Sequence, residues 1–312
     1  MRSLPDVVVT KDAGGVVRAK SQVFYDDAGY GVSGVYGLAT RTRSWHDIAN
    51  DLFIETKAKY DMYGNVIEST DGRGNVTQTE YSSAYGYAYP TKVTTPVPDS
   101  SGVNGSNTAL TTQTAYDLTT GLPTSTTDAN GQTTTISYAD PTTSILDPLL
   151  RVRKVTAPNG HQTITEYGIP DASGQLPASQ RFVKVRSQID ATKWKEAVTW
   201  ADGLGRAIKS QSINAESGDV FALTCYDTAG RVSKATNPFR GYTSQDCTTT
   251  TGLEWTTNTF DSAGRPWKVT TPDGAVVETT YSLATTGSHI GTVVTVKDQA
   301  LKQRRSITNA LG

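Results

Sequence analysis

The sequence has little net charge and no long apolar run. Its 312 residues include 29 Lys and Arg against 30 Asp and Glu, a net charge of −1. A chain so evenly charged has no field that would attract nucleic acid or an anionic membrane. No stretch approaches the ~18 apolar residues of a membrane-spanning helix, and residues 1–10 have too short an apolar core for a signal peptide. We therefore expect no nucleic-acid partner and no membrane span, and any export signal would lie outside this chain.

Cysteine is also scarce. The two cysteines, Cys225 and Cys247, lie 22 residues apart. Neither has a histidine or a second cysteine at the spacing of a metal site, so we expect no metal ligation. On neighbouring strands the pair would form a disulfide in an oxidising compartment, and otherwise they are two unconnected small side chains. The sequence leaves these two alternatives open.

A repeated spacing of glycine and tyrosine is the strongest feature that is present. Gly64 is followed by Gly74 and Tyr81, and the same intervals recur twice more. A fourth copy has Leu150 at its first glycine position but keeps the later glycine and tyrosine. Partial copies occupy residues 202–206, 225–231, 298–301 and 309–312. Internal repeats of this kind determine the architecture and are considered first.

Each copy contains a tight turn. An Asp at the first position of a type I turn accepts hydrogen bonds from the following backbone, and a Gly at the fourth position supplies φ > 0. About six residues rich in β-formers separate the turns, which is a usual strand length. Reversals at this interval predict an antiparallel meander. Tyr outnumbers Phe 15 to 6, which favours a single curved sheet with two wet faces over a thick dry core.

We therefore predict an all-β fold in which repeat hairpins form a curved, spiralling β-sheet, a partial shell or tube. Residues 1–56 are expected to form irregular β-hairpins continuous with the repeat sheet of residues 57–312, and the run 46–53 is compatible with one helical turn. The predicted structural positions of the repeats are Tyr60, Asp61, Gly64, Gly74, Tyr81, Tyr116, Asp117, Gly121, Gly131, Tyr138, Gly160, Tyr167, Asp202, Gly205, Arg206, Tyr226, Asp227, Gly230, Arg231, Asp261, Gly264, Arg265, Gly274 and Tyr281.

The Tyr-Asp pairs carry a family resemblance. Tyr-Asp occurs at 60–61, 116–117 and 226–227, each followed by Gly three or four positions later, and Gly-Arg occurs at 205–206, 230–231 and 264–265. Residues 57–312 resemble the YD repeats of Rhs-type proteins. The resemblance implies a ribbon of β-sheet that spirals into a hollow shell around a toxin polypeptide, or that displays domains at a cell surface. It also implies an extracellular structural carrier. The Asp-Pro pairs at 140–141 and 147–148 lack the Gly of the self-cleaving segment found in that family, so we expect neither the protease nor a toxin tip here.

Catalysis is not expected. The three histidines, His46, His161 and His289, have unrelated positions, and neither a nucleophile elbow nor a phosphate-binding glycine loop is present. The recurring aspartates follow the repeat period, which a turn requirement explains and a unique active site does not. The segment 71–75 resembles a calcium loop but lacks its further oxygen ligands. We expect no cofactor.

Two alternative functions remain open from the sequence. Open sheet edges could pair with further repeat sequence or with another copy of the chain, giving an extracellular filament or surface polymer. Exposed aromatic residues could instead stack on sugar rings and make the chain an adhesin, or could simply pack across strands. The aromatic residues concerned are Tyr85, Tyr87, Tyr89, Trp194 and Trp200.

Overall fold

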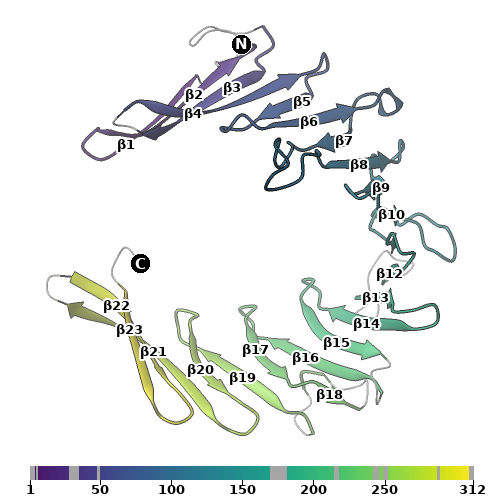
Figure 1. Ribbon diagram of the computed structural model, residues 1–312. Coiled ribbons are helices and arrows are strands. Elements are labelled where there is room, and N and C mark those ends of the chain that lie inside the picture. Colours follow the sequence, from purple (N-terminus) through teal and green to yellow (C-terminus); the bar gives the residue numbers. More distant parts are fainter. Residues whose placement is uncertain are drawn as a thin grey trace. The chain divides into compact units, whose positions relative to one another are not determined.

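The computed structural model describes residues 4, 6–27, 35–47, 50–168, 181–213, 218–241, 246–248, 252–286 and 289–308. Its elements are almost all strands (Figure 1). They are β1 (Val7–Lys11), β2 (Val17–Tyr25), β3 (Ala39–Asp47), β4 (Leu52–Tyr60), β5 (Val66–Thr70), β6 (Val76–Tyr81), the short 3-10 turn η1 (Ser83–Tyr85), β7 (Pro90–Thr94), β8 (Thr111–Tyr116), β9 (Pro123–Thr127), β10 (Thr133–Ser137), β11 (Lys154–Thr156), β12 (Gln162–Tyr167), β13 (Phe182–Gln188), β14 (Trp194–Ala201), β15 (Ala207–Ile213), β16 (Val220–Tyr226), β17 (Val232–Thr236), β18 (Phe239–Arg240), β19 (Trp255–Phe260), β20 (Pro266–Thr270), β21 (Val276–Thr286), β22 (His289–Lys297) and β23 (Gln303–Thr308).

The chain divides into two compact units. Unit 1 comprises Met1–Tyr138 and Val155–Gly160, and unit 2 comprises Ala139–Lys154 and His161–Gly312. In unit 1 each strand from β1 to β10 pairs antiparallel with the next. In unit 2 the same holds from β12 to β17 and from β19 to β23, with β17 also pairing with β19. The predicted all-β antiparallel meander is confirmed, and the finer expectation of a shell or tube stays a prediction.

The repeat turns have the geometry that their sequence dictates. In the turn that starts at Asp261, the Gly264 amide donates to the Asp261 carbonyl at 2.9 Å and the Asp261 amide donates to the Arg265 carbonyl at 3.0 Å. Gly264 has φ +79°. The pairing register shifts just before the turn, between Thr259 and Phe260. This combination is a type I turn closed by a glycine bulge, a usual three-residue hairpin connection.

Leucine takes the glycine position in two of these turns. Leu150 and Leu301 have φ of 54° and 61°, and their amides donate to the carbonyls of Asp147 and Asp298, each at 2.9 Å. The left-handed backbone is therefore a property of the turn, and it forms even where the side chain disfavours it. Both leucines follow Asp at the same interval as the glycines do.

The predicted helical turn at residues 46–53 is wrong where the structure describes it. β3 ends at Asp47, β4 begins at Leu52, and the two residues are paired in one hairpin. The rings of Trp45 and Phe53 lie opposite each other with centroids 6.3 Å apart. Cross-strand packing of these rings outweighs the weak local helical preference of so short a run. Residues 48–49 lie outside the described residues.

The sheet has very little core of its own. Among the described residues, the buried hydrophobic side chains are Phe24, Val198, Phe221, Leu223, Cys225 and Val293. β16 shows the pattern best, because every second residue from Phe221 is buried and those between are half-buried. The small number of buried side chains indicates a single-layer sheet, because a sandwich would bury the inner faces of two sheets against each other.

We predict that Gly264→Val lowers the free energy of unfolding by about 1 to 3 kcal/mol, because a β-branched residue is strained at φ +79°. Urea denaturation measures the change. Gly203→Val is the matched control: Gly203 lies inside the equivalent turn of Asp202, outside the left-handed region, and an added Cβ would meet only ordinary contacts. The control should change stability by no more than about 0.5 kcal/mol. Equal effects of the two substitutions would remove the turn argument.

Candidate functional site

Four turns of unit 2 pair an aspartate with the arginine four positions later. In the turn of Asp227, Oδ1 accepts the amides of Ala229 and Arg231 at 3.0 and 2.9 Å. Oδ2 accepts Nε and Nη2 of Arg231 at 2.8 and 2.7 Å. One carboxylate thus satisfies the turn backbone and holds a guanidinium beside it. The same pairs form between Asp147 and Arg151, Asp202 and Arg206, and Asp261 and Arg265.

Each of these arginines lies over an aromatic ring of the next repeat. The guanidinium carbon of Arg206 lies 4.2 Å from the ring centre of Tyr226, and that of Arg231 lies 4.2 Å from the ring centre of Phe260. Arg265 and Arg151 stand 4.1 and 3.8 Å from the rings of Tyr281 and Tyr167. Guanidinium groups at this distance are attracted to the negative face of the ring.

The aromatic residues connect one pair to the next. Tyr226 directly precedes Asp227, and Phe260 directly precedes Asp261. Arg206 therefore stacks on the residue before the next aspartate, and Arg231 does the same one repeat further on. We call this series the aspartate–arginine–aromatic ladder; its members are Asp202, Arg206, Tyr226, Asp227, Arg231, Phe260, Asp261, Arg265 and Tyr281.

Tyrosine hydroxyls fasten each repeat to the preceding one. Tyr226 and Tyr281 donate to the carbonyls of Ala207 and Pro266, each at 3.0 Å. Each carbonyl belongs to the residue that follows a ladder arginine. Phe260 has no hydroxyl, and at that step the Asn258 side-chain amide donates to the equivalent carbonyl, that of Val232, at 3.1 Å. The bond is thus kept although the tyrosine is not.

Other predicted tyrosines make the same kind of bond. Tyr167, Tyr60, Tyr116 and Tyr138 donate to backbone carbonyls of Val152, Ala39, Pro90 and Pro123. Tyr81 ends β6, opposite Pro90 and at a register shift of the kind that precedes the Tyr-Asp turns. The predicted glycines Gly64, Gly74, Gly121, Gly131, Gly160, Gly205, Gly230, Gly264 and Gly274 all have positive φ. The predicted glycines therefore have the backbone conformation that a turn requires.

Two turns of unit 1 have asparagine where the ladder has arginine. The Asn65 side-chain amide donates to Asp61 Oδ2 at 3.0 Å and to the Tyr87 carbonyl at 2.9 Å. Asn75 donates to Asp71 in the same way, at 2.8 Å. Asp117 begins a turn with one more residue, and its Oδ1 accepts both the amide and the hydroxyl of Thr120. In these turns the aspartate therefore still accepts the hydrogen bonds of its own turn, but no arginine extends from it to the aromatic ring of the next repeat.

The aspartates are held in their ionised form. The hydrogen bond from the Arg206 side chain holds the pKa of Asp202 below its usual value, and Arg231 does the same to Asp227. Burial of these carboxyls opposes the effect and is outweighed. For Asp261 the largest cause of the lowered pKa is the backbone amide of Arg265, followed by its side chain. Carboxylates engaged in this way are suited to structure, whereas a general acid needs a raised pKa.

The aromatic residues considered for sugar binding contact one another or cations. The rings of Tyr89 and Tyr116 are stacked with centroids 4.9 Å apart, and Tyr85 meets both edge-on. Tyr87 stacks on Tyr63 at 4.7 Å. Of the tryptophans, Trp194 lies 5.1 Å from the Arg186 guanidinium and Trp200 lies 5.6 Å from Lys209 Nζ. All five are half-buried, as packing across strands predicts, and the adhesin alternative stays a prediction.

The strand register gives each unit two unlike faces. In unit 2, one face of β13 and β14 carries Glu196 bound to Lys184 at 2.9 Å and to Arg186 at 3.2 Å. The opposite face of these strands and β15 presents mainly small side chains, among them Val185, Ala197, Thr199, Ser210 and Ser212.

Unit 1 repeats the division. Arg43 and Glu55 form a 2.6 Å pair on one face of β3 and β4. Thr42, Ser44 and Thr56 lie on the other face of the same strands. In both units, cross-strand ion pairs therefore mark one face, and short Ser, Thr, Ala and Val side chains dominate the other.

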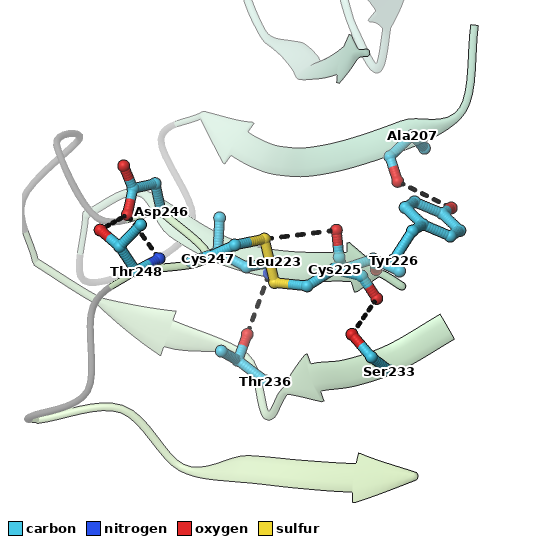
Figure 2. Close-up of a disulfide and its surroundings, with 10 residues drawn as sticks. Ala207, Leu223, Cys225, Tyr226, Ser233, Thr236, Asp246, Cys247 and Thr248 are labelled. Carbon is cyan, nitrogen blue, oxygen red and sulfur yellow. Dashed lines mark hydrogen bonds between the residues drawn. A yellow bond between two sulfur atoms is a disulfide. The ribbon is translucent and has the colours of Figure 1, made fainter. Parts of the chain in front are cut away.

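The two cysteines are joined. Cys225 and Cys247 form a disulfide with Cα atoms 5.7 Å apart (Figure 2). Cys225 is buried on β16, and Cys247 belongs to the described segment 246–248. Around the bond, the Ser233 hydroxyl donates to the Cys225 carbonyl and the Leu223 amide donates to the Thr236 hydroxyl. The disulfide thus attaches residues 246–248 to the face of β16 that is buried.

Among the described residues, no group of three or more His, Cys, Asp and Glu side chains is arranged to hold a metal ion. In the same described ranges, no helix has the length and apolarity needed to cross a membrane.

Comparison with known proteins gives one partial family match. A model described as "Domain of unknown function (DUF6443)" matches residues 178–282, a range that contains the whole ladder. No curated protein matches the chain.

Several solved structures resemble the chain over most of its length. The crystal structure of TcdB2-TccC3-Cdc42 matches at 14% identity and a TM-score of 0.42, over 98% of this chain and 17% of that chain. The structure of the Photorhabdus luminescens Tc holotoxin pore matches at 13% identity and a TM-score of 0.30, over 95% of this chain and 17% of that one. The chain therefore spans less than a fifth of the length of these relatives. Similarity this low assigns no shared activity.

We predict that acid weakens the ladder. The aspartate pKa values are lower in the folded chain than in the unfolded chain, so the carboxylates add stability above the unfolded value of about 3.9. That contribution is lost as the pH falls through the folded pKa values. Urea denaturation should give a nearly constant free energy of unfolding above about pH 5 and a progressive fall below about pH 4. Asp227→Asn should be less stable at pH 7 and should show a smaller loss between pH 7 and pH 3. An unchanged acid profile in this variant would contradict the ladder.

We predict that reduction of the disulfide destabilises unit 2. The bond spans 22 residues, and releasing a loop of that size costs about 3 kcal/mol of unfolding free energy. Urea denaturation with and without dithiothreitol measures it. Because the sequence has only 2 cysteines, the reductant has a single target. The double variant Cys225→Ala, Cys247→Ala should match the reduced protein and should not respond to dithiothreitol. Equal stability of the oxidised and reduced chains would contradict this prediction.

Proposed function

We propose that the chain is a non-enzymatic structural repeat protein whose sheet forms part of a wall that encloses or displays another polypeptide outside the cell. This is the role that the resemblance to YD-repeat shells implies. The observation that supports it most is the single-layer sheet with two unlike faces. A sheet with so few buried side chains is poorly suited to a compact globule, whereas a wall needs an inner and an outer surface and no interior of its own.

The repeat construction supports the same role. The ladder attaches each turn to the aromatic ring of the following repeat. The sheet can therefore be extended by further repeats that make the same contacts with their neighbours. Repeat proteins built in this way depend on contacts between neighbours and form extended surfaces. The resemblance to YD-repeat shells implies an enclosed toxin polypeptide, and a toxin-derived polypeptide is accordingly our proposal for what the wall would enclose.

The location outside the cell and the lack of catalysis have separate support. A disulfide persists in oxidising compartments and is rare in the cytosol. The aspartates that a hydrolase would use as acid or base are instead engaged by turn amides and arginines, with lowered pKa values. A structural role for these carboxylates accounts for their recurrence at every repeat.

The test is protection of an enclosed polypeptide. The native protein is purified from the cells that make it, together with any polypeptide bound to it. It is then treated with protease at pH 7, and the products are identified by mass spectrometry. We expect a polypeptide outside the repeat region to survive digestion. The same polypeptide should become sensitive to protease when the purified particle, the protein with its bound polypeptide, is first exposed to a pH below about 4, where the aspartates lose their stabilising effect.

Two controls make the outcome clear. The same polypeptide, released and digested alone at pH 7, should be degraded, which shows that its resistance comes from enclosure. Brief exposure to the acidic buffer followed by neutralisation with the protease absent should cause no cleavage. If no second polypeptide is attached, or if it is digested as fast in the particle as alone, enclosure is excluded.

A further inference from the structure

Unit 2 contains a pocket that belongs to no step of the ladder described above. It has a volume of about 520 Å³ and lies where two turns, those of Asp140 and Asp147, follow each other before β12. A single bridge between Ala139 and Leu146 joins the two turns. Ile145, Leu149 and Tyr167 are among the residues that line it. Pockets of this size with a mainly apolar lining and a few polar groups are typical ligand sites.

The charges in the pocket neutralise one another. Arg151 forms two hydrogen bonds with Asp147, from Nε at 3.0 Å and from Nη2 at 2.9 Å. Arg153 donates from Nη2 to Asp140, and its Nη1 lies 3.7 Å from Asp147. Two guanidinium groups thus face two carboxylates, and Asp147 has a side chain only 1% exposed. A charged ligand would find no uncompensated partner here, so charge complementarity selects an uncharged one.

One polar atom of a lining residue has no partner among the described residues. Nε of Arg153 is buried and has no hydrogen-bond acceptor in the part of the chain that the structure describes. Buried donors in proteins are nearly always bonded. Because this atom has almost no solvent-accessible surface, it lies behind the pocket surface and does not itself select the ligand.

The rim of the pocket carries two large exposed aliphatic side chains. Ile145 and Leu149 are 68% and 73% exposed, although the chain as a whole is rich in Ser and Thr. Both side chains belong to the lining. Large exposed aliphatic groups beside an apolar pocket gain free energy when a second apolar group covers them.

We propose that this pocket binds a large aliphatic or aromatic side chain of an extended polypeptide segment. Such a side chain is apolar and uncharged, as the apolar lining and the mutually paired charges of the pocket require. The inference deepens the proposed function and rests on it, since the enclosed polypeptide is the source of such segments. The pocket is the place where the wall would hold that polypeptide.

The test uses capped peptides and an isotope-labelled chain. Acetyl-Ala-Leu-Ala-amide is titrated into the full chain and binding is followed by NMR shifts of the leucine and isoleucine methyl groups. Acetyl-Ala-Lys-Ala-amide is the charged control peptide. We expect saturable binding of the leucine peptide with shifts at Ile145, Leu146 and Leu149, and at least tenfold weaker binding of the lysine peptide.

The structure provides a matched pair of variants. Leu149→Asp places a charge on the pocket rim, and Leu204→Asp places the same charge at the equivalent position of the Asp202 turn, where the leucine is 79% exposed. Leu149→Asp should weaken binding of the leucine peptide at least tenfold, and Leu204→Asp should leave it unchanged. If Leu149→Asp fails to fold, Ile145→Asp serves in its place.

The outcomes separate the two proposals. Failure of the leucine peptide to bind the unsubstituted chain, or equal binding to both variants, overturns the pocket proposal even if a protected polypeptide is found in the native particle. Saturable binding that Leu149→Asp abolishes supports the pocket. If no polypeptide is then enclosed, the wall function alone is overturned.

Discussion

The carboxylate at the first position of the aspartate-led repeat turns is the group on which the ladder depends. In Asp227 one oxygen accepts two amides of its own turn and the other holds Arg231. The guanidinium cannot then rotate freely and lies against Phe260 in the next repeat. One side chain therefore sets both the reversal of the chain and the position of the following repeat. Where an asparagine replaces the arginine, as at Asn65, the contact beyond the turn is a hydrogen bond to the Tyr87 carbonyl and not a contact with a ring.

The free energy of unfolding of such a sheet is the sum of many small contributions from individual interactions. Ion pairs at exposed sites contribute little individually, and cation–π contacts are of similar size. The repeat multiplies them, and the tyrosine hydroxyls and the disulfide add to them. That Asn258 supplies the hydrogen bond that Phe260 cannot make shows which part of the arrangement is required. The required feature is a donor at the carbonyl after the ladder arginine, and not the tyrosine itself.

The turns could be predicted from the sequence because their determinants are local. Asp at the first position, and Gly or its replacement Leu150 at the fourth, act within five residues, and turns at regular intervals force neighbouring strands to pair. The arginine–aromatic contacts could not be predicted, because Arg231 and Phe260 lie on different strands and the sequence does not give their register. The same holds for the disulfide: the sequence left bonded and unbonded cysteines open, because nothing local shows that Cys247 returns to β16. The pocket was missed although a signal exists, an aliphatic cluster around Leu149 in a polar chain.

The pairing of each strand with its neighbours in the sequence has a consequence for how the chain reaches its fold. Almost every contact between strands closes a short loop, so the entropy lost before a contact forms is small and each hairpin can form soon after its residues are available. A sheet of this kind can grow from one end as the chain leaves the ribosome or a secretion channel. It does not have to wait for distant segments, and a long polypeptide of the same construction could be assembled progressively while its first repeats are already in place.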